Sequence, residues 1–160
     1  MSARQDALYM ARAIYLAKKG RYTTDPNPRV GCVLVRNDVI IGEGWHVKAG
    51  FGHAEVEALK NVQDAQGATA YVTLEPCSHH GKTPPCTDLI IRSGIKKVLI
   101  GMPDPNPLVN GQGIAVLKQH GIVVQTGILE SECKKLNEVF IKFITSHKPF
   151  VVFKLSLIHI

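Results

Sequence analysis

The chain has 160 residues, of which 45% are hydrophobic and 20% are charged. It is therefore the size of one domain with a core of its own, and the disordered, collagen and coiled-coil classes are excluded. Nineteen Lys and Arg against 13 Asp and Glu give a net charge of +6, which favours an anionic partner. The basic residues are dispersed and only 6% of residues are aromatic, so we expect a small molecule and no nucleic acid. The apolar runs are far shorter than the roughly 20 residues that a membrane helix needs, so no membrane partner is expected. The N-terminus is charged and does not resemble a secretory signal, which predicts a cytoplasmic protein.

The first elements along the chain are predicted to be a helix and a hairpin. Ser2 caps a helix whose apolar positions recur at helical spacing as far as Leu16. Two prolines then make residues 23–28 a rigid loop. Two β-branched runs, at 30–35 and 39–45, are separated by a short polar turn and predict a β-hairpin.

Beyond the hairpin the pattern alternates between helix and strand. This alternation predicts an α/β protein, with three α/β/α layers around a mixed central sheet that is antiparallel at the hairpin and parallel later. The expected helices are 53–62, 85–92, 114–119 and 129–143, and the expected strands are 69–74, 97–101, 122–126 and 150–155. The last strand has no partner after it.

Two of the four cysteines have the sequence context of metal ligands. Cys32 lies in an apolar strand and Cys133 has no ligand-type neighbour, so neither is a site candidate. Cys77 and Cys86 each follow a proline where a helix can begin, and a helix N-terminus favours the thiolate. With His53 as third ligand, the set suits one Zn²⁺ per chain and leaves a fourth, catalytic position open. Disulfides are the alternative, although a reducing compartment disfavours them.

Glu55 is the candidate catalytic residue. It lies two residues after His53, and in the first turn of a helix both side chains can approach one water molecule. Two thiolates weaken zinc as a Lewis acid, so a nearby proton acceptor gains importance. Glu55 would accept a proton from the attacking water and deliver it to the substrate nitrogen and the leaving ammonia. The alternatives are a solvated Glu55 and a structural zinc with His79 or His80 as fourth ligand.

These motifs together resemble the cytidine-deaminase superfamily, and more closely the deaminase half of the bifunctional riboflavin-biosynthesis deaminase/reductases. The resemblance covers nearly all of residues 4–155, and the eight residues between the two cysteines single out the riboflavin branch. It implies a cytidine-deaminase-like fold and zinc-dependent hydrolytic deamination of 2,5-diamino-6-(5-phosphoribosylamino)pyrimidin-4(3H)-one to 5-amino-6-(5-phosphoribosylamino)uracil. The motifs are Asn27–Val33, Gly44–His46, His53–Glu55, Thr73–Cys86 and Asp104–Pro107.

Three candidate substrate-binding residues follow from reading the sequence against that molecule. Lys82 lies in the loop between the two cysteines, where it can reach a phosphate, with His79 beside it. The amide of Asn27 both donates and accepts, which suits the edge of a pyrimidine ring. The structural alternatives are a solvated charge at Lys82 and an Asx-turn at Asn27 before proline.

Three further candidates come from other parts of the chain. Asp104 and Asn106 follow a strand, and ligands of open α/β sheets bind at the carboxyl ends of strands, so these side chains could bond ribose hydroxyls. Both residues are also common turn formers. His46 could line the pocket near the pyrimidine.

The C-terminal part departs from the family pattern. We expect residues 1–146 to form the zinc-dependent deaminase domain, residues 147–155 to begin a reductase domain that would use NADPH, and residues 156–160 to be a non-family tail left by a truncation. No Gly-rich dinucleotide fingerprint occurs, so no reductase step is expected. The apolar run 150–155 is expected either to be disordered or to lie against another copy of the chain, and the second case predicts a homo-oligomer, a dimer or higher.

Overall fold

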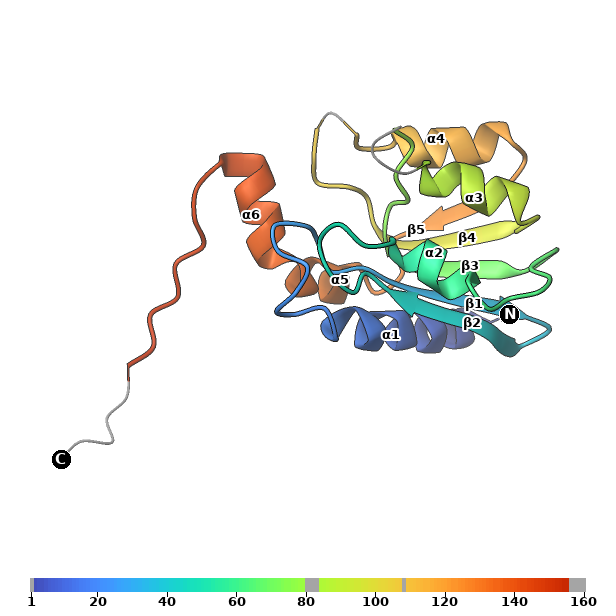
Figure 1. Ribbon diagram of the computed structural model, residues 1–160, viewed down its shortest axis with the longest axis horizontal. Helices are drawn as coiled ribbons and strands as arrows, with labels where there is room; N and C mark the ends of the chain where they lie inside the picture. Colours follow the sequence, from blue (N-terminus) through green and yellow to red (C-terminus); the bar gives the residue numbers. More distant parts are fainter. Residues whose placement is uncertain (1, 80–83, 108, 156–160) are drawn as a thin grey trace.

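The protein folds into a mixed β-sheet between two layers of helices, in a computed structural model that describes residues 2–79, 84–107 and 109–155 (Figure 1). The predicted three-layer fold is therefore confirmed. In chain order the elements are α1 (Ala3–Lys18), β1 (Gly31–Arg36), β2 (Val39–Trp45), α2 (Ala54–Leu59), β3 (Thr69–Leu74), α3 (Cys86–Arg92), β4 (Lys97–Met102), α4 (Gln112–Gln119), β5 (Val123–Thr126), α5 (Glu130–Leu136) and α6 (Glu138–Ser146).

The sheet has five strands in the order β2-β1-β3-β4-β5. Strand β1 runs antiparallel to both β2 and β3, whereas β3, β4 and β5 are parallel. This is the predicted mixed sheet. The carboxyl ends of β3 and β4 therefore lie at the same edge, which is where the loops of the candidate site begin.

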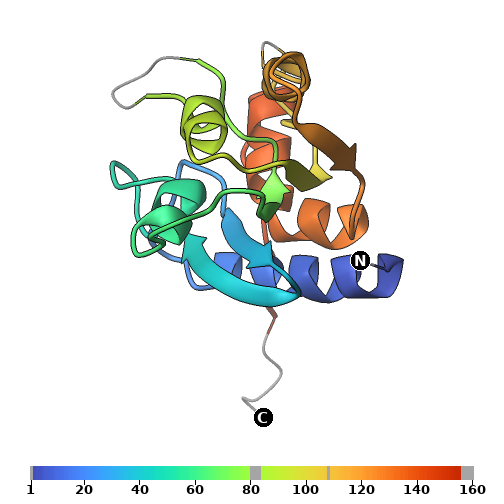
Figure 2. The same cartoon turned by 90° about the vertical axis from the view of Figure 1, so that its right-hand side faces the viewer.

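Helices α1 and α5 cover one face of the sheet, and α2, α3 and α4 cover the other (Figures 1 and 2). Successive side chains of β1 point alternately into the cores on the two faces of the sheet. Cys32 and Leu34 belong to the core under α2 and α3, whereas Val33 and Val35 belong to the core under α1. All four are almost fully buried, and such two-sided burial explains why the strands read as continuous apolar runs. Cys133 is equally buried on the α1 side, as expected for a cysteine that is not a ligand.

The helix predicted over 129–143 is wrong in one respect, because two helices, α5 and α6, meet at Asn137. The side chain of this residue is buried and bonds to the backbone of Arg29, with Oδ1 accepting from the Arg29 N–H at 2.8 Å and Nδ2 donating to the Arg29 carbonyl at 2.9 Å. The Asn137 backbone leaves the helical region, with φ −112° and ψ 21°. A contact distant in sequence therefore ends one helix and starts the next in a new direction.

We expect Asn137→Ala to lower the free energy of unfolding by about 1–3 kcal/mol, because the backbone N–H and C=O of Arg29 would lose their partners. Chemical denaturation measures this. Asn61→Ala is the matched control, since Asn61 is exposed and the change should stay within about 0.5 kcal/mol. Equal effects of the two substitutions would show that the Arg29 contact does not stabilise the fold.

The strand predicted over 150–155 is also wrong. The chain runs away from the body of the protein after α6 (Figure 1), and residues 147–155 adopt no regular structure. Phe153 is 90% exposed and Leu155 is 91% exposed. A run of β-formers becomes a strand only beside another strand, and the tail lies beside none.

Among the residues described, no helix combines the length and apolar character that crossing a membrane requires.

Candidate metal centre

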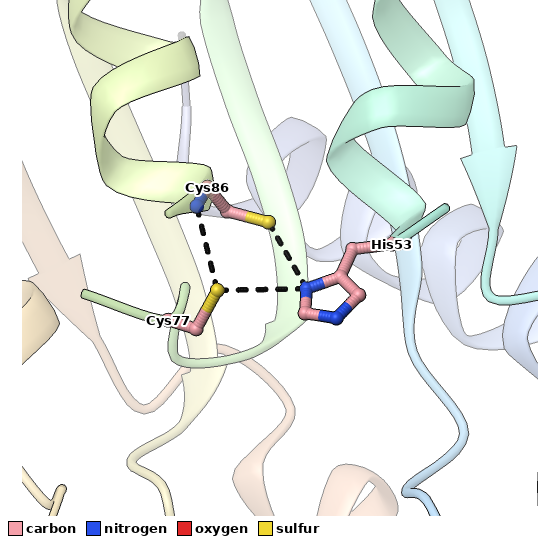
Figure 3. Close-up of side chains that lie close together, drawn as sticks. All are labelled: His53, Cys77 and Cys86. Carbon is pink, nitrogen blue, oxygen red and sulfur yellow. Dashed lines mark hydrogen bonds between the residues drawn. The ribbon is translucent and has the colours of Figure 1, made fainter. Parts of the chain in front are cut away.

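The candidate metal ligands come from three segments at one edge of the sheet. His53 is the N-cap of α2, Cys77 lies just after β3, and Cys86 is the first residue of α3. Pro85 occupies the N-cap of α3, and the fixed φ of proline suits the start of a helix. Figure 3 shows the three side chains turned toward a common point.

The spacing of the ligand atoms fits a tetrahedral zinc ion. Nδ1 of His53 lies 3.2 Å from Sγ of Cys86 and 3.5 Å from Sγ of Cys77, and all three ligand atoms lie within 4.8 Å of one another. Ligands about 2.0–2.3 Å from a tetrahedral Zn²⁺ are separated by roughly 3.3–3.8 Å, so little movement is needed. This is the only cluster of metal-ligating side chains within the described ranges, and it does not include His79.

Hydrogen bonds inside the cluster bias the protonation of its members. The thiol of Cys86 bonds to Cys77 and lowers the pKa of Cys77 to about 4, and His53 and the Cys86 backbone N–H, at 3.4 Å, act in the same direction. The same thiol contact, together with burial, raises the pKa of Cys86. The hydrogen bond to Cys77 raises the pKa of His53. The cluster thus already carries thiolate character, which a metal requires of its cysteine ligands.

Glu55 lies in the first turn of α2 and is only 4% exposed, which rules out the solvated alternative. Burial raises the pKa of its carboxyl group. A raised carboxyl pKa is the property of a group that both accepts and returns a proton near neutral pH. Glu55 thus lies in the first turn of the helix whose N-cap is His53.

A cavity of about 330 Å³ opens beside the cluster. Five of the six predicted substrate-binding residues line it; Lys82, and the alternative ligand His80, lie outside the described residues. Glu55, His53 and Cys77 also line it, so the candidate catalytic and binding groups share one space. The five are Asn27, His46, His79, Asp104 and Asn106.

His46 links two walls of the cavity. Its Nδ1 lies 3.1 Å from the carbonyl of Gly52, and its Nε2 lies 3.3 Å from Nδ2 of Asn27. Because a carbonyl only accepts, Nδ1 carries the hydrogen, and in the neutral ring Nε2 accepts from the Asn27 amide. The His46 ring also meets the His53 ring edge-on, with centroids 5.9 Å apart. His46 is only 4% exposed. Its two hydrogen bonds orient both Asn27 and the start of α2.

Phe140, Ile144 and Glu75 are among the cavity residues to which the sequence assigned no functional role. Phe140 and Ile144 line it from α6, and only the bend at Asn137 sends this helix there. Their spacing of four residues signals one helix face but not its target. Glu75 also lines the cavity. It lies within the Thr73–Cys86 motif, but its neighbours in the sequence do not distinguish it from any other carboxylate residue that follows a strand.

Comparisons with known proteins agree on one family. Residues 3–102 match the family described as the cytidine and deoxycytidylate deaminase zinc-binding region. The chain is similar to a diaminohydroxyphosphoribosylamino-pyrimidine deaminase of Buchnera aphidicola subsp. Acyrthosiphon pisum, with 57% identity over 86% of this chain and 94% of that protein. It is also similar to the riboflavin biosynthesis protein RibD of Escherichia coli, with 53% identity over 95% of this chain.

Among solved structures, the fold is similar to that of Acinetobacter baumannii RibD, with a TM-score of 0.90 and 53% identity over 93% of this chain. This chain spans 42% of the length of each of these two RibD proteins, whereas it spans nearly all of the Buchnera relative.

Proposed function

This chain belongs to the cytidine and deoxycytidylate deaminase family, and we propose that it catalyses the hydrolytic deamination of 2,5-diamino-6-(5-phosphoribosylamino)pyrimidin-4(3H)-one to 5-amino-6-(5-phosphoribosylamino)uracil. The observation that carries the proposal is that buried Glu55 lines one cavity together with His53 and Cys77, two members of the His53–Cys77–Cys86 cluster. The names of relatives at more than 50% identity support the substrate and its place in riboflavin biosynthesis.

In this proposal His53, Cys77 and Cys86 hold one Zn²⁺, which when bound supplies a Lewis acid that activates water near neutral pH. Glu55 accepts a proton from the attacking water and passes it to the ring nitrogen next to the reacting carbon. The water oxygen bonds to C2 of the ring. Glu55 then carries the second proton to the amino group, the C–N bond breaks, and ammonia leaves as the C2 carbonyl forms.

The six predicted substrate-binding residues would bind and orient the substrate. Asn27, held by His46, faces the polar edge of the pyrimidine, and Asp104 and Asn106 bond the ribose hydroxyls. His79 and Lys82 hold the phosphate through charged hydrogen bonds. An amide held by a second side chain is pre-organised, which lowers the entropy cost of binding.

We expect the phosphorylated substrate to release ammonia about 10- to 150-fold faster than its dephosphorylated form, since a charged hydrogen bond contributes about 1.5–3 kcal/mol. Cytidine and single-stranded oligonucleotides should be inert. An ammonia-release assay on these four substrates measures the preference.

Lys82→Ala should remove most of the phosphate preference and leave the metal content unchanged. Lys118→Ala is the matched control, because Lys118 is an exposed lysine in the last turn of α4. Equal rates with and without phosphate would exclude the role given to Lys82, and activity on oligonucleotides would favour a nucleic-acid deaminase.

The domain boundaries and the assembly remain part of the proposal. Residues 1–146 would form the deaminase domain and residues 147–155 the first part of a reductase domain, as the greater length of the RibD relatives suggests. NADPH would then serve only that second domain. The exposed apolar side chains of residues 150–155 would be covered by another copy in a homo-oligomer.

A further inference from the structure

Glu75 occupies the junction between β3 and the segment that ends in Cys77. Its side chain is buried, with 6% of the residue exposed. The carboxylate accepts three backbone N–H groups: Oε2 from Asp104 at 3.1 Å and from Gly111 at 3.0 Å, and Oε1 from Ile114 at 3.2 Å. A carboxylate offers about four acceptor positions, so protein donors already occupy most of them.

All three donors belong to the segment that leads from β4 into α4. This segment carries Asp104 and Asn106 into the cavity, and Oδ1 of Asp104 accepts the Asn106 N–H at 2.8 Å. The bond from Glu75 to the Asp104 N–H therefore acts directly on the first of these residues and through it on the second.

The start of α4 also packs closely against the same junction. A Cβ atom built on Gly113 would lie 2.1 Å from the carbonyl oxygen of Pro76, so only glycine permits this approach. In addition, the Glu75 N–H donates to the Met102 carbonyl at 3.0 Å, which continues the pairing of β3 with β4. The segment is thus attached to the Glu75–Pro76 junction at both of its ends.

We propose that Glu75 is a positioning residue for substrate binding: its carboxylate attaches the segment that bears Asp104 and Asn106 to the segment that bears Cys77. The distance between the sugar-binding side chains and the reacting centre is thereby fixed. The inference rests on the proposed function for the identity of the substrate, but the attachment itself is a property of the fold. Glu75 acts through Asp104 and Asn106 and is assigned no contact with the substrate.

Glu75→Gln tests this, because the amide keeps the shape but turns one acceptor into a donor that faces backbone N–H groups. We expect KM to rise about 10-fold, because the substitution removes one charged hydrogen bond. The kcat should stay within about threefold of the wild-type value, and the metal content should not change. Asp6→Asn is the matched control: Asp6 is also 6% exposed and accepts the Tyr71 hydroxyl at 2.6 Å, but it belongs to α1, on the opposite face of the sheet. The Asp6→Asn variant should have a lower free energy of unfolding and an unchanged KM.

A double-mutant cycle with Asn106→Ala separates positioning from direct contact. If Glu75 acts through the segment, the double variant should raise KM little more than the larger single effect. Fully additive effects on KM, or a kcat loss with KM unchanged, would overturn the proposal. Should Glu75→Gln not fold, Glu75→Asp keeps the charge but shortens the side chain, and the same rise in KM is expected.

Hydrogen exchange provides a readout that does not depend on activity. The amides of Asp104, Gly111 and Ile114 should lose protection in Glu75→Gln and keep it in Asp6→Asn. Retained protection at all three would overturn the attachment. If protection falls as expected but the wild-type protein deaminates none of the substrates, the proposed function fails while the attachment stands.

Discussion

Glu55→Gln is expected to lower kcat by about 10²–10⁴-fold, which is the usual contribution of a positioned general acid–base group. The amide keeps the volume of the side chain at a position that is 4% exposed, but it cannot accept the proton of the attacking water or return one to the leaving amino group. Steady-state ammonia release measures kcat, and metal analysis of the same preparation should show an unchanged zinc content.

The matched control is Glu57→Gln in the same helix. Glu57 has a 27% exposed side chain and a loose ion pair with Lys60 at 3.7 Å, so its charge can be removed with little effect on rate or stability. Turnover of Glu55→Gln near the wild-type rate would contradict the proton-transfer role. A low rate accompanied by loss of zinc would instead make Glu55 a structural support of the cluster.

Cys77→Ser is expected to abolish stoichiometric zinc binding and, with it, detectable deamination. The hydroxyl group of serine does not supply the thiolate that zinc requires, and the two remaining ligands cannot hold the ion tightly. Metal analysis gives the stoichiometry. Cobalt exchange gives a second test, since thiolate-to-cobalt charge-transfer absorption should decrease as a thiolate is lost.

Cys133→Ser controls for the loss of a cysteine as such. Cys133 is fully buried on the α1 side of the sheet, so its substitution should cost stability and leave one zinc ion per chain. Stoichiometric zinc in Cys77→Ser with an unchanged charge-transfer spectrum would exclude Cys77 as a ligand.

Features that depend on neighbouring residues were predictable from the sequence. Ser2 caps α1 with a reciprocal bond to Gln5, and Asn37 and Asp38 adopt φ values of 52° and 60° in the hairpin turn. Both motifs use short polar side chains whose effect is local. Runs of β-branched and apolar residues likewise predicted the strands, and the alternation of helical and strand segments along the chain predicted the layers. The candidate metal ligands could be selected from the sequence because His and Cys side chains are chemically distinctive and the two cysteines follow prolines.

Features that depend on contacts between residues far apart in the sequence became apparent only in the folded protein. Asn137 ends a helix because Arg29, 108 positions earlier, receives its side chain, and this bend brings α6 to the cavity. Glu75 gained its role from the N–H groups of Asp104, Gly111 and Ile114, which lie 29–39 positions later. The apolar run 150–155 had the composition of a strand but no neighbour. Side chains that are ordinary in composition take their roles from partners that folding supplies, and local patterns carry no record of those partners.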